Sequence, residues 1–178
     1  MIKSIKIQRI INECEGVKSF FFNMKKNNEK NYIHPKPGQF VMIWVPGVDE
    51  VPMSISGYDD NGNWSITVKN VGECTNAIHN LKIGDFIGVR GPLGNSFPLP
   101  IDKSKKIFLI GGGIGMAGLK SLSADLIKMD IKFTVIEGAR VGKDLIYLDE
   151  FQVYTKDYVD FHYCTDDGSY GKQGFTID

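Results

Sequence analysis

Residues 111–115, with glycine at four of the five positions, are the part of the sequence best suited to hold a phosphate group. They lie between a continuous apolar run and a segment with helical periodicity. Backbone N–H groups at a strand-to-helix turn favour an anion, and glycine lets the ligand approach the main chain. The spacing differs from the dinucleotide fingerprint G-x-G-x-x-G, and such a turn can also serve close packing alone. The turn therefore predicts a nucleotide site, with tight packing as the alternative.

Two further loops have residues that suit a phosphate or a sugar. Gly72-Glu73-Cys74-Thr75 opens a short predicted helix, where the Thr75 hydroxyl and the first N–H groups can hold a diphosphate or simply cap the helix. Residues 165–174 follow the third predicted strand of a parallel sheet, at the carboxyl edge where ligands bind. The glycines, carboxylates, Ser169 and Lys172 of this loop suit a ribose or phosphate, or an ordinary solvated turn.

Motifs for hydrolysis or metal binding are missing from the sequence. It contains no G-x-S-x-G, H-E-x-x-H or P-loop lysine motif. The three cysteines, Cys14, Cys74 and Cys164, are an odd number and lie far apart, unlike a disulfide framework or a zinc or iron-sulfur ligand run. We therefore expect no metal site in this chain and assign no catalytic acid, base or nucleophile.

The elements that must position these loops differ on the two sides of Pro100. Before it, six short apolar segments rich in β-branched and aromatic residues are separated by glycine, proline and asparagine turns, and one helix at 73–81 interrupts them. This pattern predicts a six-stranded antiparallel Greek-key barrel. The predicted strands are residues 5–11, 17–22, 39–45, 53–56, 64–68 and 86–89.

After Pro100 strands and helices alternate. Predicted strands at 106–110, 132–136 and 159–163 enclose predicted helices at 116–129 and 144–154. This alternation predicts a parallel, doubly wound sheet. We expect a boundary within residues 98–105, which divides the chain into a barrel domain at 1–100 and a nucleotide-binding α/β domain at 101–178.

The amino-acid composition argues against nucleic acid and membranes as binding partners. The 178 residues are 42% apolar and 24% charged, as in an ordinary globular protein. Lysine plus arginine equals aspartate plus glutamate at 21 each, so no bulk field attracts nucleic acid or an anionic membrane. The start of the chain has no apolar stretch of a signal peptide, and no run approaches the ~20 apolar residues of a membrane span. We expect a cytoplasmic protein without nucleic-acid or membrane partners.

Taken in chain order, seven segments together resemble one family, the electron transfer subunits of dihydroorotate dehydrogenase within the ferredoxin reductase superfamily. The resemblance covers essentially the whole chain, and it favours the phosphate interpretation of both glycine-containing helix starts. The segments are P-G-Q-F-V at 37–41, V-P-M-S-I at 51–55, residues 72–75, G-D at 84–85, G-P-L-G at 91–94, residues 111–115 and residues 165–174.

The resemblance implies that the barrel holds FAD and that the second domain brings NAD(H) or NADP(H) to the flavin in the cleft between them. Residues 51–54 match the family's R-P-x-S segment and would contact the flavin ring, 67–69 would lie along it, and 72–75 would reach the diphosphate. The glycine turn would border the nicotinamide, while Arg140 and the 166–172 loop would hold the adenosine side. The implied cofactor-binding residues are Val51, Pro52, Met53, Ser54, Thr67, Val68, Lys69, Gly72, Cys74, Thr75, Gly111, Gly112, Gly113, Gly115, Met116, Arg140, Asp166, Gly168 and Lys172.

Two departures from the family pattern matter. Val51 stands where the superfamily often has an arginine for the FAD diphosphate, which removes a charge-assisted contact worth about 1.5–3 kcal/mol. We hypothesise that Lys69 replaces it. The family chain also continues through further strands, a C-G-P loop and a cysteine-rich segment for a [2Fe-2S] cluster, none of which lies within residues 1–178. We therefore expect a fragment with an incomplete second sheet, or else a short relative completed by another polypeptide.

By resemblance, the expected function is to pass electrons between NAD(P) and a partner through bound FAD, serving dihydroorotate oxidation to orotate in pyrimidine biosynthesis. The partner would be a catalytic dehydrogenase subunit in a hetero-oligomer, expected to be a heterotetramer. One alternative is a reductase subunit of a hydrogenase, transhydrogenase or glutamate synthase-like complex, and another is a flavin-binding module without turnover. The nucleotide stays open, since Arg140 and Lys172 could accept a 2′-phosphate while Glu137 would repel one.

Overall fold

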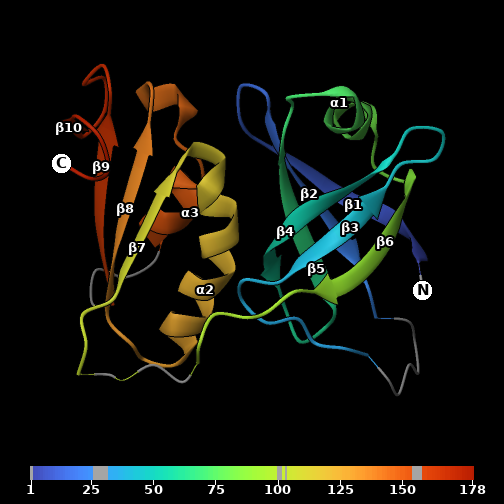
Figure 1. Cartoon of the computed structure of the whole chain (residues 1–178), viewed down its shortest axis with the longest axis horizontal. Coiled ribbons are helices and arrows are strands. Elements are labelled where there is room, and N and C mark those ends of the chain that lie inside the picture. Colours follow the sequence, from blue (N-terminus) through green and yellow to red (C-terminus); the bar gives the residue numbers. More distant parts are fainter. Residues whose placement is uncertain (1, 26–31, 100–101, 103, 154–157) are drawn as a thin grey trace.

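The computed structural model describes residues 2–25, 32–99, 102, 104–153 and 158–178 of the chain. Its strands form two separate sheets, a closed barrel and a parallel sheet, with helix α2 (Met116–Lys128) between them (Figure 1). The boundary expected within residues 98–105 falls partly outside these ranges, so the division at residue 100 stays a prediction.

The predicted six-stranded antiparallel barrel is confirmed. Its strands lie in the order β1-β2-β5-β4-β3-β6, and each pair of neighbours is antiparallel. Helix α1 (Glu73–Asn80) follows β5 and precedes β6. The strand bounds are β1 Lys3–Cys14, β2 Val17–Asn23, β3 Phe40–Trp44, β4 Glu50–Tyr58, β5 Asn63–Lys69 and β6 Phe86–Leu93.

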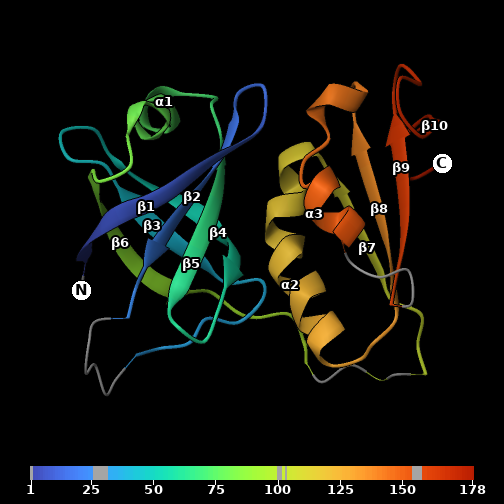
Figure 2. The same ribbon diagram turned by 180° about the vertical axis from the view of Figure 1, so that it is seen from behind.

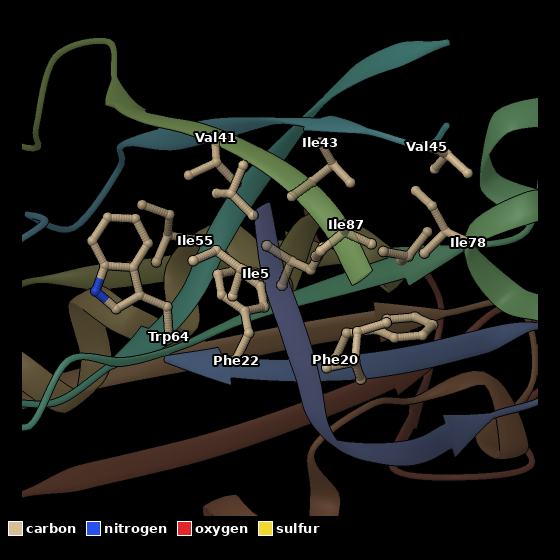
Figure 3. Close-up of a cluster of buried hydrophobic side chains, with 14 of the residues drawn as sticks. Ile5, Phe20, Phe22, Val41, Ile43, Val45, Ile55, Trp64, Ile78 and Ile87 are labelled. Carbon is tan, nitrogen blue, oxygen red and sulfur yellow. The ribbon is translucent and has the colours of Figure 1, made fainter. Parts of the chain in front are cut away.

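The barrel closes around a core of aromatic and β-branched side chains. Phe20 and Phe22 of β2 and Trp64 of β5 are almost completely buried and pack with isoleucines from the other strands (Figure 3). Alternation sends Phe20 and Phe22 of β2 inward, and Val41 and Ile43 of β3 likewise, as period-two patterning requires. This packed interior makes the barrel a rigid support for the loops at its ends.

The second sheet is parallel and has the order β10-β9-β8-β7, with bounds β7 Phe108–Gly112, β8 Phe133–Ala139, β9 Val159–Thr165 and β10 Lys172–Gln173. Helix α2 and helix α3 (Leu148–Val153) lie on the same face of this sheet, toward the barrel (Figures 1 and 2). Consecutive right-handed crossovers in one direction place their helices on one face. The apolar side chains of Phe108 and Ile110 are about half exposed.

The glycine turn is shorter than predicted. The strand expected at 106–110 lies two residues further along, because Gly111 and Gly112 pair with Glu137 and Gly138 of β8. Only the 3₁₀ turn η1 (Gly113–Gly115) separates β7 from α2. Glycine is disfavoured in strands, which is why the sequence pattern ended this strand too early.

The helix predicted at 144–154 is also different. The chain instead forms a 3₁₀ turn η2 (Gly142–Asp144), three buried non-helical residues and then α3, while Tyr154 lies outside the described residues. The amide of Ile146 donates to Glu137 Oε1 at 2.8 Å, and Tyr147 has a left-handed φ of +63°. The Ile146 amide is used by the Glu137 carboxylate, and the backbone of Tyr147 is outside the helical region, so the helix cannot begin before Leu148.

Candidate cofactor site

A cavity of about 670 Å³ opens at the carboxyl ends of β7, β8 and β9, where they face the turn between β1 and β2 of the barrel. Carboxyl ends of parallel strands are where ligands bind in open α/β sheets. Five of the predicted cofactor residues line it together: Lys69, Gly112, Gly113, Arg140 and Asp166. The structure therefore brings the glycine turn, the end of β5 and the end of β8 around one space.

The glycines on this wall leave room for a ligand. A Cβ built on Gly113 or Gly115 would have no atom within 4 Å, and one on Gly112 would only reach the Gly138 carbonyl oxygen at 4.0 Å. Side chains here would fill open space rather than collide with the protein, so the bare backbone is accessible to a phosphate or a ring. These positions leave the space that the predicted nucleotide site would need.

Gly111 and Met116 have a packing role instead. A Cβ on Gly111 would lie 2.5 Å from the Met116 sulfur, and Met116 is 1% exposed within the core behind the sheet. Gly111 thus satisfies the close-packing alternative, and both residues support the turn from behind it.

The predicted flavin residues of β4 lie on the barrel, outside the lining of this cavity. Pro52 and Ser54 are exposed, and Gly118 of α2 faces Ser54, since a Cβ there would lie 3.6 Å from the Ser54 hydroxyl. Val51 and Met53 pack partly against the barrel core. The exposed side of this segment therefore lies beside the helix that follows the glycine turn.

The helix start at Gly72 to Thr75 is capped by its own threonine. Thr75 Oγ1 accepts the backbone N–H groups of Val71 and Gly72, each at 2.9 Å. Cys74 is buried with its thiol 3.7 Å from the carbonyl of Asp49, which precedes β4. The Thr75 hydroxyl thus serves as a cap, and Gly72, which is exposed with no atom within 4 Å of a built Cβ, offers open backbone at this helix start.

On β5 the three predicted residues point in different directions. Val68 is in the barrel core, and Thr67 is 4% exposed with its hydroxyl bonded to Ser19, Ser56 and Tyr147. Only the Lys69 side chain is exposed, and it lines the cavity. Side-chain contact with a ligand is therefore open to Lys69 alone among these three residues.

Of the three cofactor residues predicted in the loop after β9, one lines the cavity. Asp166 lines the cavity, but Gly168 sits at a turn with φ of +73°, and Lys172 belongs to the short strand β10 rather than to the loop. Ser169 Oγ accepts the backbone N–H of Gly142 at 2.7 Å, so this loop braces η2.

The cavity wall has mixed charge. Lys69, Arg140 and Lys143 bring positive charge, and Lys143 pairs with Glu15 at 3.3 Å. Within the described part of the chain, Arg140 is exposed and has no ion-pair partner. Its guanidinium is therefore available to a phosphate.

The sequence analysis expected Glu137 to face the nucleotide and repel a 2′-phosphate, but the structure buries this side chain. Its side chain is 0% exposed and lies outside the cavity lining, so it is not placed to repel a 2′-phosphate directly. Burial raises its pKa to about 7, partly offset by the hydrogen bond from the Ile146 amide. Its second carboxyl oxygen is buried without a hydrogen-bond partner in the described residues.

Several lining residues were not predicted. Gly138, Thr176 and Cys14 all border the cavity, and the Thr176 methyl lies 2.5 Å from a Cβ built on Gly138. Gly138 comes just after the strand predicted at 132–136, as the glycine turn comes just after the strand predicted at 106–110, and that position was the available signal. Within the ranges that the structure covers, no group of three or more histidine, cysteine or acidic residues could hold a metal ion. Nor is any helix of those ranges long and apolar enough to cross a membrane.

A closed antiparallel barrel followed by a parallel sheet is the architecture of the ferredoxin reductase class of oxidoreductases. Residues 4–97 match the oxidoreductase FAD-binding domain family, and the chain belongs to that family. The solved structure of an NADH-dependent reduced ferredoxin-NADP oxidoreductase superposes with a TM-score of 0.79 at 29% identity, covering 96% of this chain and 59% of that one.

The most informative curated relatives are electron transfer subunits. A probable dihydroorotate dehydrogenase B (NAD(+)) electron transfer subunit of Methanocaldococcus jannaschii is 40% identical over 97% of this chain and 60% of its own. The corresponding protein of Methanocella arvoryzae is 38% identical over 98% of this chain and 61% of its own. Sulfhydrogenase 1 subunit gamma of Pyrococcus furiosus is 36% identical over 83% of this chain and 52% of its own. The chain spans about three-fifths of the length of the two dihydroorotate dehydrogenase B relatives.

Proposed function

We propose that this protein moves electrons between a nicotinamide nucleotide and bound FAD, as the electron transfer subunit of a larger complex. The observation that carries the proposal is the single cavity in which the bare glycine turn, Lys69 and Arg140 meet. It has room for part of a dinucleotide, and it lies between the FAD-binding barrel and the sheet. A site between two cofactor-binding parts suits transfer from one cofactor to the other.

The residues of this chain act by binding and orientation. Exposed Pro52, Ser54 and Gly72 would meet the flavin and its diphosphate, with Lys69 supplying the positive charge that Val51 lacks. Gly112 and Gly113 would let the nicotinamide approach the backbone, while Arg140 would hold the phosphates on the adenosine side. FAD supplies the exchange between two-electron and one-electron chemistry when bound. The protein need supply no acid or base, because a hydride passes from one ring to the other.

The partner belongs to the same proposal. Relatives named as dihydroorotate dehydrogenase electron transfer subunits support a catalytic dehydrogenase partner that oxidises dihydroorotate to orotate for pyrimidine biosynthesis. We propose a heterotetramer, in which a [2Fe-2S] cluster would take its ligands from outside these 178 residues. All three cysteines are free, in keeping with the reducing cytoplasm. The similarity to the sulfhydrogenase gamma subunit supports a hydrogenase-type complex as the second candidate.

An absorbance titration tests the proposal. The protein reconstituted with FAD is titrated without oxygen, first with NADH and then with NADPH, and the visible flavin band is followed. Bleaching by one nucleotide supports the reductase function and identifies the preferred cofactor. A flavin that neither nucleotide bleaches would point to a binding module without turnover. Failure to take up FAD would contradict the proposal as a whole.

A further inference from the structure

Tyr147 connects the parallel-sheet part of the molecule to the barrel through a buried hydrogen bond. The residue is 3% exposed, and its hydroxyl donates to Thr67 Oγ1 of β5 at 2.6 Å. Its left-handed φ of +63° is unfavourable for a residue with a bulky side chain. Such a conformation persists only where the surrounding contacts impose it, so the structure holds this ring in one place at some cost.

The hydrogen bond continues into the barrel. Thr67 Oγ1 lies 2.7 Å from Ser19 Oγ of β2, and Ser19 Oγ donates to the Glu13 carboxylate at 2.5 Å. Since the Ser19 proton is used on Glu13, the Thr67 proton is shared between Ser19 Oγ and Ser56 Oγ, the latter at 3.2 Å, and Tyr147 donates to Thr67. The three hydroxyls therefore form one directed chain that ends on a carboxylate and joins three barrel strands to the second sheet.

Three members of this chain, Tyr147, Glu13 and Thr67, are close in sequence to residues that line the cofactor cavity. Ile146 and Cys14, which line the cavity, are the sequence neighbours of Tyr147 and Glu13. Lys69 is two residues beyond Thr67 on the same strand. A displacement of the Tyr147 hydroxyl would therefore move the sheet wall of the cavity relative to its two barrel walls.

The other side of the Tyr147 ring is fixed as well. Lys120 Nζ of α2 lies 4.3 Å from the ring centroid and forms an ion pair with Glu150 of α3 at 2.7 Å. The Lys120 side chain is only 9% exposed, and Phe151 meets the ring edge to face at 5.9 Å. The ring is thus held by both helices of the sheet while its hydroxyl reaches the barrel.

From these contacts we propose that Tyr147 is a positioning residue, whose hydroxyl sets the nucleotide-binding sheet at the distance from the barrel that hydride transfer needs. The inference rests on the proposed function. Packing alone does not account for the residue, because phenylalanine would fill the same volume without the hydroxyl. Transfer between two rings depends steeply on their separation, and an error of about 1 Å can cost about a hundredfold in rate.

The chain contains a matched control. The hydroxyl of Tyr163 on β9 is also buried but has no hydrogen-bond partner among the residues that the structure describes. Tyr147→Phe and Tyr163→Phe each delete one buried hydroxyl oxygen, and only the first deletes a link between the sheet and the barrel. A general effect of the substitution would appear in both variants, and an effect of the link would appear in one.

Two measurements on the FAD-loaded chain test the proposal. In anaerobic stopped-flow reduction, Tyr147→Phe should lower the limiting rate by about ten- to a hundredfold, with the nucleotide Kd and the FAD content unchanged. In hydrogen exchange, amides in residues 12–17 and 145–151 should exchange about tenfold faster in Tyr147→Phe, because the link no longer restrains local opening. Tyr163→Phe should leave both measurements as in the wild type.

The outcomes separate this proposal from the proposed function. Unchanged exchange in Tyr147→Phe would overturn the positioning role, whether or not the flavin is reduced. A lower rate that tracks a weaker nucleotide Kd or a loss of FAD would also overturn it, since the residue would then act on binding. If neither nucleotide reduces the wild-type flavin, the proposed function fails. Exchange then decides alone whether Tyr147 links the two sheets.

Discussion

Tyr58 at the end of β4 donates a hydrogen bond of 2.6 Å to Asp125 Oδ2 of α2. Both side chains are partly buried, and the contact lies at the opposite end of the barrel-to-sheet interface from the cofactor cavity. With the Tyr147–Thr67 hydrogen bond and the Lys143–Glu15 ion pair, both at the cavity end, it links the second sheet to the barrel through side chains. Side-chain contacts therefore hold the interface between the barrel and the sheet at both of its ends.

Removal of this link should destabilise the protein. Tyr58→Phe leaves the ring in place but takes the donor from Asp125, and a hydrogen bond to a charged group is worth about 1.5–3 kcal/mol. Partial exposure places the expected loss near the lower end, about 1.5 kcal/mol, in urea unfolding at pH 7. Tyr163→Phe, which removes a hydroxyl without a described partner, serves as the control. Equal losses in both variants would contradict the assigned role of the Asp125 contact.

Alkaline pH should weaken the folded state. Burial, and then the hydrogen bond and negative charge of Asp125, raise the pKa of Tyr58 well above its ordinary value of 10. Because the folded-state pKa is raised, the stabilisation is complete below pH 10 and is lost as the pH rises beyond it. The free energy of unfolding should fall above about pH 10 in the wild type, and less steeply in Tyr58→Phe. An identical slope in the two proteins would count against this origin.

Glu137 should make the free energy of unfolding depend on pH in the acidic range. Burial raises its folded-state pKa from 4.5 to about 7, so the protonated form is favoured in the folded protein. Below pH 4.5 the carboxyl is protonated in both states and carries no penalty. The penalty grows between pH 4.5 and 7 and is constant above, on the order of 3 kcal/mol. The wild type should therefore lose stability through this range.

The variant Glu137→Gln tests that expectation, because its amide oxygen can still accept the Ile146 N–H. Urea unfolding at pH 4.5, 6 and 8 should show a smaller loss with rising pH than in the wild type, and higher stability at pH 8. Glu73→Gln alters an exposed glutamate in the first turn of α1 and is the matched control. If Glu137→Gln is less stable than the wild type at pH 8, the carboxylate is needed in its charged form.

Local patterning was enough to predict the barrel, because its strands bury alternate side chains and end at glycine and proline turns. The place of the glycine turn between a strand and a helix was also predictable, since it follows an apolar run and precedes a segment with helical periodicity. The end of β7 could not be predicted, because the pairing of Gly111 and Gly112 with β8 overrides the poor strand propensity of glycine. Likewise, Tyr147 resembled an ordinary helical residue, and its role depends on Thr67, which is 80 positions away in the sequence.

The hypothesis that Lys69 replaces the missing arginine leads to a paired experiment. Lys69→Met should weaken FAD binding by about ten- to a hundredfold, because one charge-assisted contact worth about 1.5–3 kcal/mol is lost. Val51→Arg in the same variant should recover much of that affinity. The FAD Kd at low and high salt is the measurement, and Lys143→Met, which removes another lysine of the cavity wall, is the control. A Lys69→Met Kd equal to that of the wild type would sink the hypothesis.

Two alanine substitutions should separate the binding sites of the two cofactors. Gly112 has an ordinary φ of −109° and Gly72 an extended one of −169°, and neither has a close atom around a built Cβ. Alanine should therefore cause no strain at either position, and folding stability should stay the same or rise slightly. In Gly112→Ala the new methyl enters the cavity, so nucleotide Kd should rise about tenfold while the FAD Kd is unchanged. In Gly72→Ala the FAD Kd should rise instead.

Calorimetric titration of each variant with FAD, and of the FAD-depleted protein with NADH, measures both constants separately. The reciprocal pattern follows from where each methyl would stand: over the carboxyl edge of the parallel sheet for Gly112, and at the start of α1 for Gly72. Thermal unfolding of both variants checks that the fold is retained. If Gly112→Ala weakens FAD and leaves NADH binding intact, the two ligands occupy the reverse of the proposed places, and the assignment of the glycine turn to the nicotinamide nucleotide is wrong.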